Sequence, residues 1–199
     1  EKYFDASVQM QRKSKNSYFI SDTLSQKISE TKNSQGVFAV CKMKNENISL
    51  KTDQKYIALD NLQDPGNLGT VIRTAEALGI SSVIVGGGCD VFNPKVLRAS
   101  MGSVLRLDVF ECQSLAPVLQ KAKSLGIKTY ATSPDSSAKK INETQFPKSS
   151  LCVIGNEANG VSDEVMNICD ETVTIPMLGR AESLNAHVAG AIVMWEMLR

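Results

Sequence analysis

Polar residues that can hold a ligand follow a strand-like run near the C-terminus, in the sequence TIPMLGRAESLNAHV at residues 174–188. The β-branched run at residues 172–175 predicts a strand that stops at Pro176. The apolar stretch that begins at Ser183 predicts a helix reaching the end of the chain. Ser183 and Asn185 then lie at a helix N-terminus, where unpaired backbone N–H groups favour a polar ligand. Taken alone, these residues favour an ordinary helix cap with nothing bound.

A second polar cluster lies in LDNLQDPGNLGTVIRTAEALG, residues 59–79. We expect a strand ending near residue 60, a Pro-Gly turn, and a helix capped by Asn67 that holds Gly69 and Arg73 in its first turns. Both Asn67 and Arg73 then lie near the carboxyl ends of the strands. This edge is where open α/β sheets bind ligands.

A third cluster is LCVIGNEANGV, residues 151–161, in which an apolar strand runs directly into a glycine-containing loop. Gly155 and Gly160 lack side chains, so we expect the backbone there to approach a ligand closely, with the carboxylate of Glu157 beside it. In isolation, this pattern is weak evidence for a ligand site.

The glycine run VIVGGGCD at residues 83–90, with Asp108 twenty residues after Gly88, has roughly the spacing of a dinucleotide or Rossmann-type methyltransferase fingerprint. That fingerprint requires a helix that opens directly on the glycines. Here the sequence CDVFNP, with its proline, intervenes. We therefore do not favour a Rossmann-type site.

Composition excludes several classes of function. With 199 residues, 42% hydrophobic and 22% charged, the chain can form one good-sized core, or a core domain with a small partner. Its single histidine, His187, excludes metal motifs that need two, and no metal site is expected. The five cysteines include no CxxC pair, which argues for reduced thiols and against zinc. Cys41 and Cys152 lie in apolar runs that predict buried strands.

The formal net charge of +1 neither demands nor excludes a nucleic-acid partner. No apolar run approaches the roughly 20 residues that span a bilayer. The first residues are polar and lack the apolar core of a signal peptide. Neither membrane nor export is indicated, so we expect a cytoplasmic protein.

From about Tyr56 onward, short apolar runs alternate with helical stretches, which predicts an α/β domain with a mainly parallel sheet and helices on both faces. Before it, SDTLSQKISE predicts a helix capped by Ser21 or Asp22, and GVFAVCK predicts a strand. The polar stretch KMKNENISLKTD is typical of a linker. We expect the remainder of a small domain at 1–45, a linker at 46–54 and the α/β domain at 55–199.

The predicted terminal helix at 183–199 has apolar residues at helical spacing and several small residues, so it can bury more than one face. A helix of this kind at a chain end often packs on a second subunit. The apolar positions are Leu184, Val188, Ala191, Ile192, Trp195 and Leu198.

Taken together, the three clusters resemble the three ordered motifs of the SpoU (TrmH-like) branch of the SPOUT RNA methyltransferases. The resemblance covers residues 55–199, and residues 16–45 resemble the end of the small RNA-binding domain, similar to ribosomal proteins L30e and L7Ae, that many members have. The matching positions are Asn67, Gly69 and Arg73 in the first motif; Gly155, Glu157 and Gly160 in the second; and Ile175, Pro176, Met177, Gly179, Ser183, Leu184 and Asn185 in the third.

The resemblance implies a homodimer with a C-terminal trefoil knot that uses S-adenosylmethionine to methylate a ribose 2′-OH in rRNA or tRNA. The L30e-like front domain favours rRNA. Two alternatives stay open: a catalytically silent RNA-binding or assembly factor of the same fold, and a base-methylating SPOUT enzyme. Intact motif residues argue against the first, and the Ser-Leu-Asn of the third motif with the arginine of the first argues against the second.

By the family pattern, the methyl donor lies among three loops, near Thr132, at Gly155 and from Ile175 to Leu184. Arg73 is the residue that the family assigns to activation of the ribose hydroxyl, and Asn67, Glu157, Ser183 and Asn185 arrange the site around it.

A literal arginine base is costly, because its pKa lies some 6 units above neutral and deprotonation costs roughly 8 kcal/mol. We therefore expect Arg73 to position a phosphate and to stabilise developing alkoxide charge.

The chain departs from the family where SLNVSVA is common and SLNAHVA is present, which introduces Ala186 and His187. His187 can reach the donor site or pack in the knot or dimer interface, and we favour packing. Asn156, between Gly155 and Glu157, lies at a position that the motif leaves variable and is expected to matter little.

Overall fold

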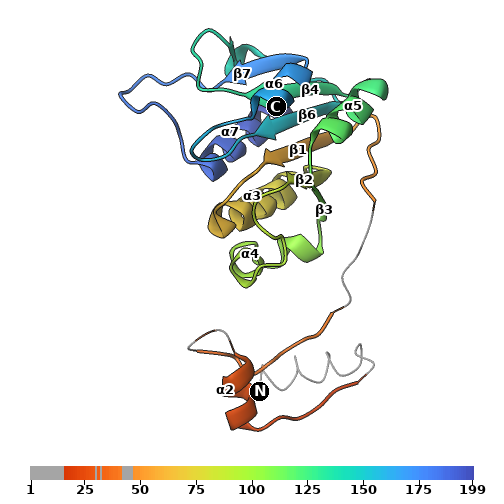
Figure 1. Ribbon diagram of the computed structural model, residues 1–199, viewed down its shortest axis with the longest axis vertical. Coiled ribbons are helices and arrows are strands. Elements are labelled where there is room, and N and C mark those ends of the chain that lie inside the picture. Colours follow the sequence, from red (N-terminus) through yellow and green to blue (C-terminus); the bar gives the residue numbers. More distant parts are fainter. Residues whose placement is uncertain (1–15, 30, 32, 42–46) are drawn as a thin grey trace. The chain divides into compact units, whose positions relative to one another are not determined.

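The computed structural model describes residues 16–29, 31, 33–41 and 47–199 (Figure 1). The chain divides into two compact units, Glu1–Asn45 and Glu46–Arg199. In the first unit, helix α2 (Asp22–Ile28) begins after Ser21, whose Oγ accepts a hydrogen bond from the backbone N–H of Leu24 at 3.2 Å. The predicted helix and its serine cap are confirmed. Residues 1–15, which we assigned to the same small domain, lie outside the described residues.

The strand predicted at GVFAVCK is wrong over its described part, residues 36–41, which has no regular secondary structure. Val40 is fully exposed, and Cys41 is exposed as well, not buried as the apolar run suggested. An extended segment becomes a strand only when its backbone groups pair with a neighbour. In the described residues of this unit, no strand is present to pair with it.

The second unit is built on a seven-stranded sheet in the order β3-β2-β1-β6-β4-β7-β5, in which every neighbouring pair is parallel. The predicted parallel α/β sheet is therefore confirmed. The strands are β1 (Lys55–Asp60), β2 (Ser82–Gly86), β3 (Asp108–Cys112), β4 (Lys128–Thr132), β5 (Lys139–Lys140), β6 (Ser150–Ile154) and β7 (Glu171–Thr174). The two-residue edge strand β5 has no apolar alternation and was not predicted.

Helices cover both faces of this sheet, as predicted (Figure 1). One core contains the buried faces of α3, α4 and α7, and the other contains those of α5 and α6. The helices are α3 (Pro65–Leu78), α4 (Pro94–Ala99), α5 (Ala116–Ser124), α6 (Asp163–Ile168) and α7 (Ala186–Leu198), with short 3-10 turns at Ser103–Leu105 and Ile141–Glu143.

Strand β1 shows why the central strands are apolar throughout. Ile57 and Leu59 point into the core with α3 and α7, whereas Tyr56 and Ala58 point into the core with α5 and α6. Alternate side chains leave opposite faces of a strand, so a strand covered by helices on both faces needs a continuous apolar run.

Helix α3 begins at Pro65, earlier than we predicted, and its cap is Asp64 instead of Asn67. The Oδ1 of Asp64 accepts a hydrogen bond from the backbone N–H of Asn67 at 2.9 Å. Proline suits the first helical position because it has no N–H to satisfy. The Asp-Pro pair therefore places Asn67 inside the first turn, where its side chain is available for other contacts.

Helix α7 begins at Ala186, later than the predicted start at Ser183. The Oδ1 of Asn185 accepts a hydrogen bond from the backbone N–H of His187 at 2.9 Å and so caps the helix. Ser183 lies outside the helix, in the loop that joins β7 to α7. In that loop, residues 176–183 are exposed.

The glycine run after β2 supports a neighbouring loop and does not open a helix. Gly88 has a φ of +81°, and a Cβ there would overlap the carbonyl oxygen of Leu62 in the loop after β1. The backbone N–H of Cys89 donates to that same oxygen at 2.9 Å. Helix α4 begins only at Pro94, so the structure agrees that this segment lacks the Rossmann arrangement.

Residues 47–54, part of the predicted linker, belong to the second unit. Leu50 is buried in the core with α5 and α6. The backbone N–H of Lys51 donates to the Tyr56 hydroxyl at 2.8 Å. Among the described residues, no helix is long and apolar enough to cross a membrane.

Gly69 holds α3 close to α4, and Gly69→Ala should therefore lower the free energy of unfolding. A Cβ at this position would lie 2.6 Å from the Ala99 Cβ and 2.7 Å from the Val96 carbonyl oxygen. Overpacking of this kind costs about 1–3 kcal/mol. Chemical denaturation measures the loss. The control is Gly179→Ala, where no atom lies within 4 Å and the expected change is under about 0.5 kcal/mol. Equal stability of the two variants would contradict the prediction.

Candidate active site

The three predicted motifs follow β1, β6 and β7, and the sheet brings them to one edge. In the strand order, β1 lies beside β6, and β4 lies between β6 and β7. Leu59 pairs with Ile154, so the loops after β1 and β6 leave the sheet at the same level. All these strands are parallel, so their carboxyl ends share one edge, where α/β sheets bind ligands.

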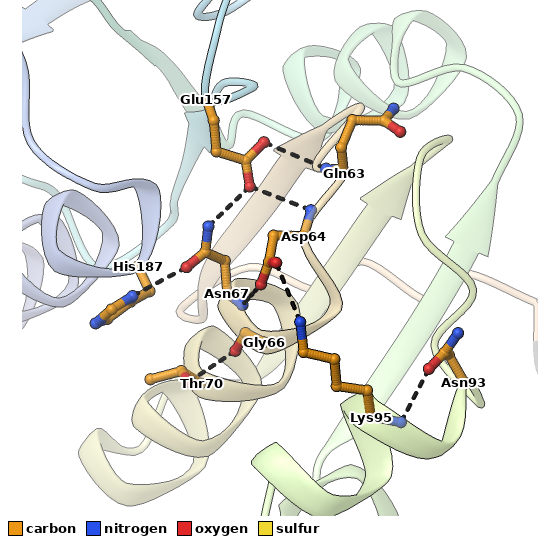
Figure 2. A network of polar contacts seen from close by, with 9 residues as sticks. All are labelled: Gln63, Asp64, Gly66, Asn67, Thr70, Asn93, Lys95, Glu157 and His187. Atoms are coloured by element: carbon orange, nitrogen blue, oxygen red, sulfur yellow. Dashed lines mark hydrogen bonds and ion pairs between the residues drawn. The ribbon is translucent and has the colours of Figure 1, made fainter.

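The carboxylate of Glu157 is the centre of a polar network at this edge (Figure 2). Its Oε1 accepts hydrogen bonds from the Asn67 side-chain Nδ2 at 2.8 Å and from the backbone N–H of Asp64 at 3.3 Å. Its Oε2 accepts one from the backbone N–H of Gln63 at 3.3 Å. The loop after β6 is thereby bonded to the loop after β1 and to α3.

These bonds set the charge state of the network. Burial raises the pKa of Glu157, but the hydrogen bonds from Asn67 and from the backbone amides of Gln63 and Asp64 lower it more, and the net pKa lies below the ordinary value. The Glu157 carboxylate is therefore ionised at neutral pH and acts as a hydrogen-bond acceptor only.

Asn67 connects this carboxylate to α7. Its side chain is only 8% exposed, and its Oδ1 lies 3.1 Å from the Nδ1 of His187 (Figure 2). For His187 we favoured packing in the knot or dimer interface over reach to the donor site, and this stays a prediction. Within the chain, the half-buried ring hydrogen-bonds to a motif residue that itself binds Glu157.

Two supporting residues were missed in the sequence. Asp64 caps α3, and its Oδ2 lies 3.3 Å from the Nζ of Lys95. The pKa of Asp64 is lowered, most strongly by the hydrogen bond from the backbone N–H of Asn67 and also by Lys95. Asn156, which we expected to matter little, donates from Nδ2 to the Asn61 carbonyl at 2.7 Å and so bonds the loops after β6 and β1. The Asp-Pro pair was a sequence signal for the role of Asp64, whereas no sequence signal identified the role of Asn156.

The other predicted catalytic residues do not join the network. Arg73 is exposed on α3, and in the described part of the chain nothing hydrogen-bonds or ion-pairs with it. Ser183 is exposed in the loop before α7, and Asn185 uses its side chain as the helix cap. The structure thus brings Asn67 and Glu157 into contact, and it leaves Arg73 and Ser183 open to a ligand.

Gly155 has a structural role in addition to the donor contact that we predicted, which stays a prediction. A Cβ at Gly155 would overlap the backbone of Gly160 and Val161. The loop closes on itself there, since the N–H groups of Asn156 and Gly160 each donate to the carbonyl of the other residue, at 2.9 and 3.0 Å. The glycine therefore permits a tight loop that presents Glu157.

A cavity of about 570 Å³ lies beside the loop that follows β7. Its volume is in the range of small-molecule sites. Four residues were predicted to bind the donor. Ile175 lines this cavity, whereas Thr132, Gly155 and Leu184 do not. The Thr132 hydroxyl donates a hydrogen bond to the Val153 carbonyl at 3.0 Å. The lining residues are Pro134, Ser136, Lys140, Thr174, Ile175, Pro176, Met177, Leu178, Ala181 and Glu182.

No group of three or more potential metal ligands is present within residues 16–29, 31, 33–41 and 47–199.

Glu157→Gln should weaken the folded state most at neutral pH. A carboxylate whose pKa is lowered on folding stabilises the protein above its unfolded-state pKa and loses that contribution as pH falls through the lowered value. The stability difference between the wild type and the variant should thus disappear as pH falls below the ordinary glutamate value of 4.5. Urea denaturation between about pH 2.5 and pH 7 measures it. A difference that is constant with pH would contradict the prediction.

Comparison with known proteins identifies the family. The model of the SpoU rRNA methylase family matches residues 54–195. The 23S rRNA (guanosine(2553)-2′-O)-methyltransferase RlmP of Bacillus subtilis is 36% identical over 181 residues, which are 90% of this chain and 71% of that protein.

Two solved structures resemble this chain in sequence and fold. The SpoU methyltransferase AviRb of Streptomyces viridochromogenes, in complex with the cofactor AdoMet, is 33% identical with a TM-score of 0.68, over 76% of this chain and 59% of that chain. A structure described for 2-OH methylation of C/U34 on tRNA is 28% identical with a TM-score of 0.66, over 72% of this chain and 93% of that chain. With its three motif loops at one sheet edge and a family match over most of its length, the chain belongs to the SpoU family of RNA methyltransferases.

Proposed function

We propose that this chain carries the catalytic domain of an S-adenosylmethionine-dependent RNA methyltransferase that methylates a ribose 2′-OH. The main support is the network in which Glu157, Asn67 and His187 join three motif-bearing elements at the carboxyl edge of the sheet. The names of the relatives add to it, because the Bacillus subtilis protein is a 23S rRNA 2′-O-methyltransferase and AviRb was solved with AdoMet.

The donor site is the cavity beside the loop after β7. S-adenosylmethionine supplies an electrophilic methyl group on a sulfonium. The apolar residues Ile175, Pro176 and Met177 fit the adenine ring, and Lys140 and Glu182 bring one charge of each sign, which matches an amino-acid zwitterion. From the family pattern, Thr132, Gly155 and Leu184 complete the donor site with main-chain groups.

The acceptor site includes Arg73. An arginine that is exposed and lacks a partner in the described residues is available to bind an RNA phosphate. Deprotonating it would cost roughly 8 kcal/mol, so Arg73 binds phosphate and stabilises developing negative charge on the ribose oxygen. By the family pattern, Ser183, in the loop before α7, and Asn185, the cap of α7, complete the site around Arg73. In the reaction the S–CH₃ bond breaks, the O–CH₃ bond forms, and the hydroxyl proton passes to solvent.

The substrate is rRNA in preference to tRNA. The rRNA relative matches 90% of this chain, which is more than the unit Glu46–Arg199 contains, so the match extends into Glu1–Asn45. The tRNA-related structure matches 72% of this chain. We therefore assign residues 1–45 to an L30e-like RNA-binding domain, residues 46–54 to its connection, and residues 55–199 to the catalytic domain. The enzyme then works in the cytoplasm, where rRNA is accessible.

The C-terminal segment forms the trefoil knot of the family. The support is its path: β7 lies beside β4 near one edge of the sheet, and after the loop at residues 175–185 the chain returns to pack α7 against α3 and β6. A return of this kind takes the chain back over the loops that hold the donor.

The enzyme is a homodimer through α7. Val188, Trp195 and Leu198 are apolar and exposed on this helix, Trp195 to 61% of its side chain. Exposed apolar patches on helices are typical of protein interfaces, and the simplest partner is a second copy of the chain.

Incubation with methyl-labelled S-adenosylmethionine and ribosomal RNA, followed by complete digestion to nucleosides, tests the function. We expect the label in a 2′-O-methylnucleoside. Label in a methylated base would identify a base-methylating enzyme instead. Absence of label with RNA binding retained would identify a silent assembly factor, and either result contradicts the proposal.

Arg73→Lys should reduce kcat by about 10²–10³-fold at neutral pH, because the planar guanidinium binds phosphate through two parallel bonds that an ammonium does not reproduce. Donor binding by calorimetry should be unchanged, since Arg73 does not line the donor cavity. The control is Lys121→Arg on α5, which also exchanges one basic side chain for another and should leave kcat unchanged. Near wild-type activity of Arg73→Lys would exclude both a base and a phosphate-positioning role.

Trp195→Glu should shift the chain toward the monomer. A buried interface tryptophan contributes about 2 kcal/mol or more, which corresponds to an increase of about 30-fold in the dimer Kd. Sedimentation velocity over a concentration series measures the change. Leu125→Glu, which alters an exposed apolar residue next to α5, is the control and should leave the dimer intact. If the wild-type chain sediments as a monomer at every concentration, the dimer proposal is wrong.

A further inference from the structure

His187 is the only histidine in the chain, and it occupies the first turn of α7. Its ring is half-buried, with Nδ1 3.1 Å from the Oδ1 of Asn67. Figure 2 shows the ring at one end of the network, with Glu157 at the other end and Asn67 between them. The direction of this hydrogen bond depends on which nitrogen of the His187 ring carries the proton.

The hydrogen bonds of Glu157 determine where this proton lies. Its carboxylate only accepts hydrogen bonds, and at 2.8 Å it requires the NH₂ group of Asn67 to point toward it. A rotated amide would set the Asn67 oxygen against a charged carboxylate oxygen, with the donor lost as well. The orientation of the amide is therefore fixed, and the carbonyl oxygen of Asn67 faces His187.

An oxygen facing the ring needs a donor there, so Nδ1 of His187 bears the proton. The neutral ring is then the Nδ1–H tautomer, with its Nε2 unprotonated. Over the described residues, no group hydrogen-bonds to Nε2. The Nδ1–H contact persists when the ring takes a second proton, because both nitrogens of the imidazolium are donors.

We propose that His187 is a positioning residue of the methyl-acceptor site, held as the Nδ1–H tautomer by Asn67 and in turn holding the Asn67 amide against Glu157. This deepens the proposed function and rests on it for the kinetic consequence. The three residues belong to α3, the loop after β6 and α7, so the contact fixes the start of α7 relative to the other two motifs. Without a donor at this position, the Asn67 side chain is restrained on one side only.

The tautomer is measured directly in the unmodified chain. Nitrogen-15 labelling of the full chain gives a single pair of histidine ring nitrogens, so the spectrum needs no assignment by mutation. At about pH 9, where an ordinary imidazole is neutral, we expect a protonated Nδ1 and an unprotonated Nε2. Asn67→Ala should convert the ring to the Nε2–H form that free histidine prefers. An Nε2–H ring in the wild-type chain would overturn the proposal.

Two substitutions separate positioning from other roles. His187→Asn keeps an N–H donor close to the place of Nδ1 and removes Nε2, whereas His187→Leu fills similar space with no donor. We expect kcat for methyl transfer to fall about tenfold in the leucine variant, in line with the loss of one hydrogen bond. The asparagine variant should stay within about threefold of wild type, and KM for the donor should be unchanged in both.

Equal losses in the two variants, with thermal unfolding showing both folded, would mean that Nε2 itself is required, and the positioning role would be wrong. A chain that transfers no methyl group to any RNA would refute the proposed function alone. The ring-nitrogen spectrum would still decide whether His187 donates to Asn67.

Discussion

The site depends on one interaction: the acceptance of three hydrogen bonds by the Glu157 carboxylate. Its donors are the Asn67 side chain and the backbone N–H groups of Gln63 and Asp64. Because a carboxylate only accepts, it fixes which end of the Asn67 amide faces it and so which end faces His187. One charge thereby sets the geometry of the loop after β1, the loop after β6 and the start of α7.

The sheet makes this interaction possible. Strands β1 and β6 are far apart in sequence but adjacent and parallel in the sheet, so their loops leave the same edge. Glycines then let the supporting backbone approach closely: Gly155 closes the loop that presents Glu157, and Gly88 packs on the loop after β1. Of the two, only Gly155 was predicted to bind the donor, and that role stays a prediction. The absence of a side chain at both glycines is needed within the protein, to hold the loops that form the site.

Much of the fold was predictable because it is encoded locally. The apolar runs that became β1, β2 and β6 are continuous, as expected for strands covered on both faces. Errors occurred where a local pattern has more than one outcome. Asn67 and Ser183 both resemble helix caps, but Asp64 and Asn185 are the caps that form. The apolar segment at residues 36–41 resembles a strand, but the described residues of its unit include no strand with which it could pair.

The sequence by itself determined the alternation of the longer strands and helices from β1 onward, the family and the residue types of the site, because hydrophobic periodicity, capping residues and motif spacing act over short stretches of chain. Only the tertiary structure decided which of those residues meet. Asn67 and Glu157 are 90 positions apart, and Asn67 and His187 are 120 apart. No local pattern encodes such contacts; they exist because parallel pairing of β1 with β6, and packing of α7 on α3, bring the three segments together.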